Sequence, residues 1–508
     1  MRRRVLQVLA GLGGLLLVAV VGVMLFIRWA TSHDPFEPVY AENCAVCHGT
    51  QLEGAAQGPA LAGALLTHGD SVEAIERSIA AGFPERGMPA WSATLGAAEI
   101  RSLAIYIAER RVERRFTEFK VDAPLILPDG IVASERHGFR VETVAEGLDP
   151  LPYSIALLPD GRILVTEKKR GLRVVSPDGT STLVTGTPDT GFGVKLGPLE
   201  QGVGWLLDVE AHPDHATNGW IYLHHGDLCR GCPEVDGALI PRSMNRLVRG
   251  RIRDGAWVDE EVVWSADPST YTSMSDMTAG GRIAFDGEGH VFLSVGMKGP
   301  ANYLGIQDLA LPYGKVHRVH DDGRIPQDNP FVGVPNAMPS IWTYGHRSPQ
   351  GLEVDRRTGR LWGTEMGPRG GDEVNHLRPG RNYGWPLVSK GLDYDGTPVE
   401  YGEQLGIEPD LDAIEPPVVD LTPAPAVSSF VVYDGDAFPE WRGQLIVGTL
   451  KAAELQRIVL DGDTWVHSEV LLRDLARIRD VETAADGSLY LLLEHASGSR
   501  IVRLVPAG

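Results

Sequence analysis

Positive charge and cysteine are both scarce in this chain of 508 residues. There are 47 Lys and Arg residues against 67 Asp and Glu, which gives a formal net charge of −20. With no long run of Lys and Arg, the composition argues against a nucleic-acid-binding protein, which needs positive charge to meet the phosphates. The four cysteines fall into two closely spaced pairs, Cys44/Cys47 and Cys229/Cys232. In an exported chain both pairs can be covalently bonded, in a disulfide or to a cofactor.

Long apolar runs are also absent, with one exception near the N-terminus. Val5–Ile27 contains no charged residue and would span roughly 35 Å as a helix, enough to cross a membrane. The "MRRR" that precedes it favours a cytoplasmic N-terminus. A cleaved signal peptide is the alternative, although no A-x-A-like site follows. We therefore expect residues 1–34 to be an inner-membrane anchor, with the rest of the chain in the periplasm.

Residues 35–115 carry the pattern of a small helical domain with a covalent haem. The stretch "ENCAVCHGT" contains C-x-x-C-H, in which Cys44 and Cys47 would attach haem c and His48 would bind the iron. Met88, in "RGMPAW", is the expected second axial ligand, because a Met thioether is a common partner of His in cytochromes c. The alternatives are a zinc or disulfide pair for the cysteines and a core-filling role for Met88.

A closing helix is predicted at the end of this domain. In "AAEIRSLAIYIAERR", apolar residues recur at i, i+3, i+4 and i+7 from Ile100, which is typical of an amphipathic helix. Residues 116–140 contain Pro124 and Pro128 and show no sustained period. We expect them to be a linker between two domains, because the chain is too long for one ordinary core.

Residues 141–508 are dominated by short apolar alternations that follow turns. A turn with glycine followed by a strand recurs six times, which predicts an all-β, six-bladed β-propeller. The six segments are "DGRILVTE", "TNGWIYLHH", "GEGHVFLSVG", "TGRLWGTEMG", "WRGQLIVGTL" and "DGSLYLLLE". Their uneven spacing implies long loops, which often carry function on a rigid scaffold. An array of β-sandwiches is the alternative.

The second cysteine pair lies in "GDLCRGCPE", which lacks the histidine of a haem site. We expect Cys229 and Cys232 to form a disulfide in an oxidising compartment. A redox-active pair is the alternative, and metal binding would need further ligands that the sequence does not identify.

Several cations stand at strand ends or in loops of the predicted propeller. Arg347 precedes Gln350 in "YGHRSPQGLEVD", Lys451 ends a strand, and Arg477 and Arg479 alternate in "ARIRDVE". Arg477 and Arg479 would share one strand face, where they repel each other unless an anion or carboxylates lie between them. Each cation alone is more often a solvated charge. Gathered at one mouth of a propeller, they favour a small, highly anionic ligand.

These residues carry a resemblance to a known family. From about residue 141 onward the chain resembles the soluble quinoprotein sugar dehydrogenases, which are six-bladed propellers that bind pyrroloquinoline quinone (PQQ) with calcium. The matching strings, in family order, are "LLDVEAHPD", "GKVHRVHDDGRIPQDNPF", "GHRSPQGLEVD", "EMGPRGGDEVN", "NYGWP" and "RIRDV". PQQ carries three carboxylates, and guanidinium groups bind carboxylates through strong charge-assisted hydrogen bonds.

The resemblance also implies a set of site residues. Those that would hold PQQ are Arg347, Gln350, Lys451, Arg477 and Arg479. Gly367 and Pro368 would offer backbone carbonyls to a Ca²⁺ beside the quinone, since calcium prefers oxygen ligands in irregular loops. Glu373 and Tyr383, with Asp372 alongside, match a second, structural calcium site. Loop capping is the alternative role for the two acidic residues.

The sequence departs from the family where the catalytic base is expected. The family's base histidine falls here on Thr278, or on Met277 if the alignment shifts by one, and neither side chain is a general base near neutral pH. Asp276 is the nearest titratable candidate. Met297 stands where an aspartate is usual, and Ser348 replaces an asparagine.

The sequence thus predicts a membrane-anchored PQQ-dependent sugar dehydrogenase with its own cytochrome. A sugar-like alcohol or hemiacetal would be oxidised, and electrons would pass one at a time through the haem to a respiratory or periplasmic acceptor. Two alternatives stay open: a catalytically silent propeller that serves as a binding scaffold, and an enzyme that uses Asp276 on a different substrate.

Overall fold

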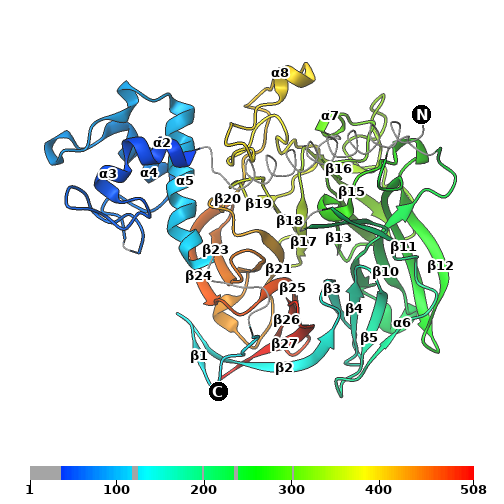
Figure 1. Ribbon diagram of the computed structural model, residues 1–508. Helices are drawn as coiled ribbons and strands as arrows, with labels where there is room; N and C mark the ends of the chain where they lie inside the picture. Colours follow the sequence, from blue (N-terminus) through cyan, green and yellow to red (C-terminus); the bar gives the residue numbers. More distant parts are fainter. Residues whose placement is uncertain are drawn as a thin grey trace, which may run out of the picture. The chain divides into compact units, whose positions relative to one another are not determined.

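The computed structural model describes residues 36–63, 65–116, 124–196, 199–233, 238–299 and 303–507 (Figure 1). The chain divides into two compact units. One comprises Met1–Glu113 with Leu392–Pro398, and the other comprises Arg114–Gly391 with Val399–Gly508. The expected anchor, Val5–Ile27, lies outside the described residues. None of the helices in the described ranges is long and apolar enough to cross a membrane.

The first unit is helical. Its helices are α2 (Phe36–Asn43), α3 (Ala45–His48), α4 (Val72–Ala81) and α5 (Ala97–Phe116), with 3-10 turns η1 (Pro84–Arg86) and η2 (Trp91–Ala93). Ser71 caps α4 by accepting a hydrogen bond from Ala74 N. The predicted closing helix is present as α5, and its apolar stripe, including Leu103 and Ile107, is buried against α4 and Tyr40. This packing leaves the short α3 at the edge of the core.

The second unit is a propeller of six antiparallel sheets, as predicted. Blade one is built from β3 (Pro152–Leu157), β4 (Ile163–Glu167), β5 (Gly171–Val175) and β6 (Ser181–Leu183). Blade two is built from β9 (Leu206–Ala211), β10 (Ile221–Leu228), β11 (Ser243–Arg253) and β12 (Ala256–Ser265). Blade three is built from β13 (Gly280–Phe285), β14 (His290–Val295), β15 (Lys315–His320) and β16 (Ile341–Tyr344).

The other three blades follow the same plan. Blade four is built from β17 (Pro349–Asp355), β18 (Arg360–Glu365), β19 (Glu373–His376) and β20 (Val419–Asp420). Blade five is built from β21 (Val427–Val432), β22 (Leu445–Thr449), β23 (Leu455–Asp461) and β24 (Thr464–Leu472). Blade six is built from β25 (Arg477–Thr483), β26 (Leu489–Glu494), β27 (Ser499–Pro506), β2 (Gly138–Leu148) and β1 (Val132–Ala133).

Smaller elements lie between these strands. They are the hairpin β7 (Phe192–Leu196) and β8 (Leu199–Val203), the helices α6 (His215–Asn218), α7 (Tyr303–Ile306) and α8 (Gly402–Leu405), and the 3-10 turns η3 (Pro268–Thr270), η4 (Asp276–Thr278) and η6 (Pro439–Trp441).

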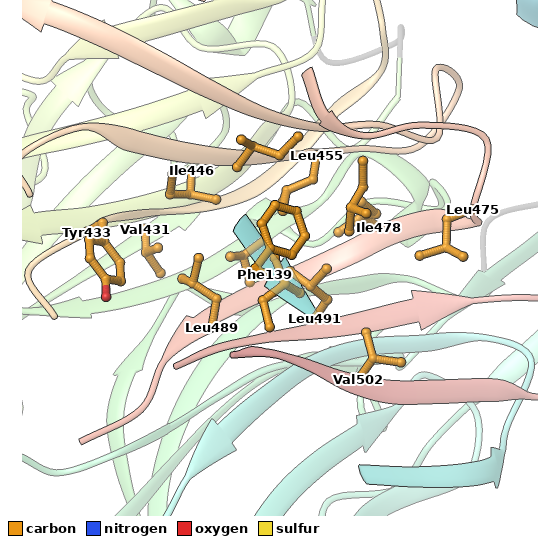
Figure 2. Close-up of a cluster of buried hydrophobic side chains, with 14 of the residues drawn as sticks. Phe139, Val431, Tyr433, Ile446, Leu455, Leu475, Ile478, Leu489, Leu491 and Val502 are labelled. Carbon is orange, nitrogen blue, oxygen red and sulfur yellow. The ribbon is translucent and has the colours of Figure 1, made fainter. Parts of the chain in front are cut away.

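The last blade joins the two ends of the propeller sequence. β2 comes from the start of the unit and pairs with β27 from its end, with Phe139 opposite Pro506 and Val141 opposite Leu504. Phe139 is fully buried among side chains of β25, β26 and the fifth blade, as Figure 2 shows. Because β2 from the start of the unit completes the blade built by its last strands, this pairing closes the ring of blades.

The inner strands position the site. β3, β9, β13, β17, β21 and β25 pack against one another around the centre, and each pairs antiparallel with the second strand of its own blade. The first residues of the inner strands and the last residues of the second strands therefore meet at one end of the propeller. Every PQQ-binding candidate lies at this end, which we call the upper end.

Candidate functional site

The C-x-x-C-H segment lies on α3 in a form that suits a haem. Cys44 and Cys47 are free thiols rather than a disulfide, and burial raises the pKa of Cys44 to about 11. The Nδ1 atom of His48 lies 2.9 Å from the carbonyl oxygen of Pro59. This hydrogen bond fixes the imidazole and leaves Nε2 for an iron ligand bond. Met88 forms a backbone bridge with Phe83.

Apolar side chains complete this region. Leu61, Leu66, Trp91 and Leu95 are only partly buried against the core of the helical unit. Apolar groups left partly open beside two free thiols and an oriented histidine fit a covalent haem. Cys44, Cys47 and His48 would hold it, with Met88 as the proposed second axial ligand.

In the propeller, Arg477 and Arg479 meet around one carboxylate. Glu494, at the end of β26, accepts from Arg477 Nε at 2.7 Å and from Arg479 Nε at 2.8 Å. Burial acts to raise the pKa of Glu494, but Arg479 and Arg477 hold it at about 2. The carboxylate that the sequence requires between these arginines is therefore Glu494, which the sequence analysis did not identify.

Arg347 and Lys451 belong to a second group, around Asp372. The Nη1 atom of Arg347 donates to the carbonyl oxygens of Met366 and Gly367 at 3.1 and 2.9 Å. Burial raises the pKa of Asp372 to about 7, although the charges of Arg347 and Lys451 act to lower it. Asp372 also accepts hydrogen bonds from the backbone nitrogens of Gly367 and Val427. The carboxylate thus shapes the predicted calcium loop.

Arg282 lies beside Arg479 and Gln350 and was also missed by sequence analysis. Its guanidinium pairs with Asp208 at 3.1 Å and Asp480 at 2.9 Å, and it donates to the backbone oxygens of Gln350 and Arg479. It therefore joins β9, β13, β17 and β25. The side chain of Gln350 donates to Ser348 Oγ at 3.0 Å. The sequence signal available was the segment "GGR", which begins β13 and says nothing about the partners of Arg282.

Glu373 and Tyr383, the expected structural calcium residues, lie beside a row of carboxylates. Glu373 pairs across the sheet with Glu365 on β18 and Asp420 on β20. Burial and the charge of Glu365 raise the pKa of Glu373 well above its usual range. Tyr383 instead bonds through its hydroxyl to the backbone of His376 and Arg378. Within the described ranges, no three such side chains are arranged to hold a metal ion.

The turn where the family resemblance places the catalytic base contains Asp276 and Thr278, and both side chains are already hydrogen-bonded. Thr278 ends η4, and its hydroxyl accepts a hydrogen bond from Gly299 N at 3.0 Å. Asp276 is buried and its two carboxylate oxygens meet Lys298 Nζ at 2.7 Å and Trp205 N at 3.1 Å. Accepting a proton would break this buried ion pair, so the geometry argues against Asp276 as a general base.

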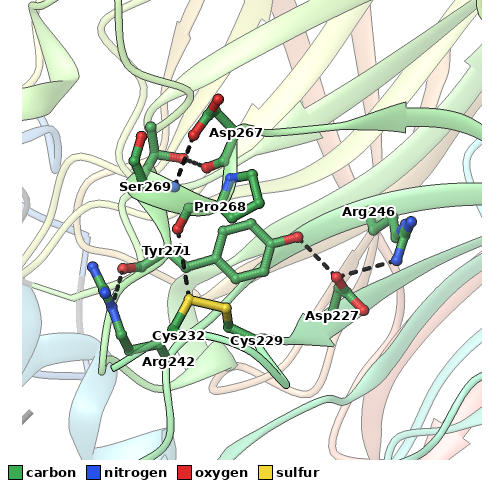
Figure 3. Close-up of a disulfide and its surroundings, with 10 residues drawn as sticks. Asp227, Cys229, Cys232, Arg242, Arg246, Asp267, Pro268, Ser269 and Tyr271 are labelled. Carbon is green, nitrogen blue, oxygen red and sulfur yellow. Dashed lines mark hydrogen bonds and ion pairs between the residues drawn. A yellow bond between two sulfur atoms is a disulfide. The ribbon is translucent and has the colours of Figure 1, made fainter. Parts of the chain in front are cut away.

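The second cysteine pair forms a disulfide, Cys229–Cys232, as expected (Figure 3). It lies beside Tyr271, whose hydroxyl donates to Asp227 at 2.8 Å, and Arg246 pairs with the same carboxylate at 3.2 Å. A cavity of about 990 Å³ opens here, lined by the disulfide and by the ends of β10 and β12. None of the predicted PQQ-binding residues lines it.

Comparisons with known proteins agree with this architecture. Residues 150–503 match the family "Glucose / Sorbosone dehydrogenase", and residues 32–107 match "Cytochrome C oxidase, cbb3-type, subunit III". The aldose sugar dehydrogenase YliI of Escherichia coli is 34% identical over 382 residues, which cover 74% of this chain and 95% of that protein.

A second bacterial protein and a solved structure are also similar to this chain. The quinoprotein glucose dehydrogenase B of Acinetobacter calcoaceticus is 25% identical over 456 residues, covering 74% of this chain and 90% of that protein. The apo-form crystal structure of the soluble aldose sugar dehydrogenase from Escherichia coli has a TM-score of 0.63 at 32% identity, covering 72% of this chain and 99% of that one. The chain belongs to the glucose/sorbosone dehydrogenase family and carries a cytochrome c domain at its N-terminus.

Proposed function

We propose that the chain is a PQQ-dependent sugar dehydrogenase that delivers its electrons to its own haem. The observation that carries this proposal is the cluster of cations at the upper end of the propeller. Arg477 and Arg479 share the carboxylate of Glu494, and the charges of Arg347 and Lys451 act on Asp372. A tricarboxylate ligand would suit such a cluster, and the quinoprotein relative supports PQQ as that ligand.

The chain's own residues would divide the work of binding. Arg347, Gln350, Lys451, Arg477 and Arg479 would orient the cofactor, and the carbonyls of Gly367 and Pro368 would hold a Ca²⁺ beside it. Glu373 and Tyr383 would belong to a structural calcium site, where the crowded carboxylates of β18, β19 and β20 supply negative charge. PQQ, when bound, supplies the two-electron acceptor for oxidation of an alcohol or hemiacetal.

We expect the activity on ordinary aldoses to be slow. By the family resemblance the base position falls on Thr278, or on Met277 if the alignment shifts by one, and a positioned general base contributes typically ~10²–10⁴-fold to the rate. This same feature favours the second candidate function, a silent propeller that serves as a scaffold for an electron-transfer cytochrome. The two functions differ in one measurable property, which is sugar oxidation that depends on PQQ.

The test uses the full chain with haem attached, titrated with PQQ in the presence and absence of Ca²⁺. We expect Ca²⁺-dependent binding and slow aldose oxidation with an added dye acceptor. Arg479→Ala leaves Glu494 without its main partner and should weaken PQQ binding by about 2–5 kcal/mol. Arg503→Ala, on β27 in the same blade, is the control and should bind normally.

Thr278→His tests the catalytic half. The substitution should raise turnover on aldoses, whereas Thr278→Val, which keeps the shape and removes the hydroxyl, should not. Rapid aldose oxidation by the unmodified chain would show that a different group acts as base. Failure of the unmodified chain to bind PQQ would favour the scaffold function.

For location, we propose that Val5–Ile27 anchors the chain in the inner membrane and that both domains face the periplasm. The acceptor of the haem electrons would then be a respiratory or periplasmic protein.

A further inference from the structure

Two hydrogen-bond donors at the upper end of the propeller have no acceptor among the described residues. Lys168 follows β4 and is 8% exposed, and its Nζ lies over the rings of Tyr153 and Trp205 instead of forming a hydrogen bond or ion pair with a described residue. Trp205 precedes β9 and is 7% exposed, and its indole Nε1 is likewise without a hydrogen-bond partner among the described residues. The Lys168 Nζ lies 5.1 Å from the centre of the Trp205 ring, so the two donors are neighbours in space.

The backbone holds both residues firmly. Lys168 N donates to Leu151 O at 3.1 Å, and Lys168 O accepts from Leu206 N at 3.0 Å. Trp205 N is bonded to the carboxylate of Asp276. The backbone of blades one and two therefore fixes the positions of these two side chains. Backbone flexibility at Lys168 or Trp205 does not explain the missing acceptor.

The charges around Lys168 leave a positive excess. Its Nζ lies 5.5 Å from the centre of the Tyr153 ring, which Arg282 and Arg479 approach at 4.7 and 6.0 Å. Arg282 is offset by Asp208 and Asp480. The charged groups that act most on the pKa of Lys168 include Arg479, Glu494, Arg477 and Arg282. Glu494 is already paired with both remaining arginines, so the lysine shares this carboxylate with two other cations.

We infer that Lys168 is a further cofactor-binding residue, which together with the indole N–H of Trp205 receives a carboxylate of PQQ beside Arg479. The inference rests on the proposed function. It goes beyond the residues carried over from the family resemblance, because Lys168 and Trp205 come from blades one and two, which contribute none of those residues.

A consequence is that binding takes up a proton. Burial, followed by the charge of Arg479, lowers the pKa of Lys168 to about 7. At pH 8 the free protein therefore holds Lys168 mostly as the neutral amine. An arriving carboxylate favours the charged ammonium and raises this pKa, so the lysine is protonated as the anion binds.

Calorimetric titration of the full, haem-loaded chain with PQQ and Ca²⁺ tests the inference. Titrations at pH 8 in two buffers with different ionisation enthalpies give the number of protons taken up. We expect close to one proton for the unmodified chain. Lys168→Met should bind about thirtyfold more weakly or worse, because a buried charge partner is lost, and should take up no proton through this site.

Lys168→Arg is the decisive variant, since arginine stays protonated and can bind a carboxylate. It should bind PQQ with nearly normal affinity and with about one proton fewer taken up. This comparison separates Lys168 from other groups that titrate in this range, such as Asp372, and holds even if Lys168→Met does not fold. Lys169→Met, at the neighbouring exposed position, is the control and should change neither quantity.

Unchanged proton uptake in Lys168→Arg, or unchanged affinity in folded Lys168→Met, would overturn the inference. If the unmodified chain binds no PQQ, the proposed function fails instead. Citrate, a tricarboxylate, is then the second probe: citrate binding that Lys168→Met weakens would retain the anion site without the cofactor, and no binding of either would overturn both.

Discussion

Three glutamates inside the propeller show how strongly their surroundings change the pKa of single residues. Glu210, Glu353 and Glu482 lie on the inner strands β9, β17 and β25 of alternate blades. Burial raises the pKa of Glu353 to about 8, and it raises those of Glu210 and Glu482 well above their usual range. The charges of the three side chains also act on one another. We therefore expect this ring to make stability depend on pH.

Glu353→Gln tests that expectation. An unfolded glutamate loses its proton above a pKa of about 4.5, whereas the folded protein keeps it up to about pH 8. Stability from this group is therefore complete below pH 4.5 and is lost as the pH rises toward 8. Glu353→Gln should raise the unfolding midpoint at pH 8 and change it little at pH 4.5. Exposed Glu288→Gln is the control, and an equal shift for Glu353→Gln at both pH values would contradict the account.

Met88 is the second residue whose role can be isolated. Replacing it with alanine removes the proposed thioether ligand, and Met/His ligation raises the haem potential. Met88→Ala should abolish the sulfur-to-iron charge-transfer band and lower the potential, as followed by absorption during a redox titration. An unchanged spectrum and potential would eliminate Met88 as the ligand.

At the residue scale, the sequence predicted donors better than it predicted their partners. Arg477 and Arg479 were recognisable because they alternate along one strand. Their partner Glu494 is the last residue of the next strand, and its role follows only from the pairing of Arg477 with Glu494. Asp276 could be proposed as a base because nothing in the sequence places Lys298 against it. Pairing between strands decides such contacts, and no local pattern contains it.

At the scale of elements, the recurring turn-and-strand segments were sufficient to predict the blades. The six segments form β4, β10, β14, β18, β22 and β26, which are the second strands of the six blades. These strands are predictable because a glycine turn and an apolar run are both local. The closing strand β2 was not, since the range assigned to the linker ends inside it and its partner β27 lies at the other end of the unit.

Phe139 on β2 should therefore carry much of the closure. Its ring packs at 6.0 Å from that of Trp441 and at 6.4 Å from that of Phe438, both from the fifth blade. Phe139→Ala should lower the free energy of unfolding by about 3–5 kcal/mol, the usual cost of removing a buried aromatic ring. Denaturant unfolding measures this. Ile131→Ala, at an exposed position just before β1, is the control, and a similarly small effect of both would show that β2 is dispensable.

For the whole molecule, anchoring is the first question. If Val5–Ile27 spans the membrane, the chain should sediment with the membrane fraction and resist extraction by salt. N-terminal sequencing of that material should then give the uncleaved start of the chain. A mature chain that begins near Thr31 and is recovered from the soluble fraction would contradict the anchor.

One chain contains both a propeller and a cytochrome domain. Tethering raises the effective concentration of the haem for electrons that leave the propeller. Electron transfer should therefore occur within one molecule and should not depend on protein concentration.

Stopped-flow absorption of the oxidised full-length protein, loaded with PQQ and Ca²⁺ and mixed with an aldose, tests this claim most directly. We expect complete reduction of the haem, at a rate that is independent of protein concentration and that vanishes when PQQ is omitted. A haem that stays oxidised while the same sample oxidises the sugar with an added dye would contradict it.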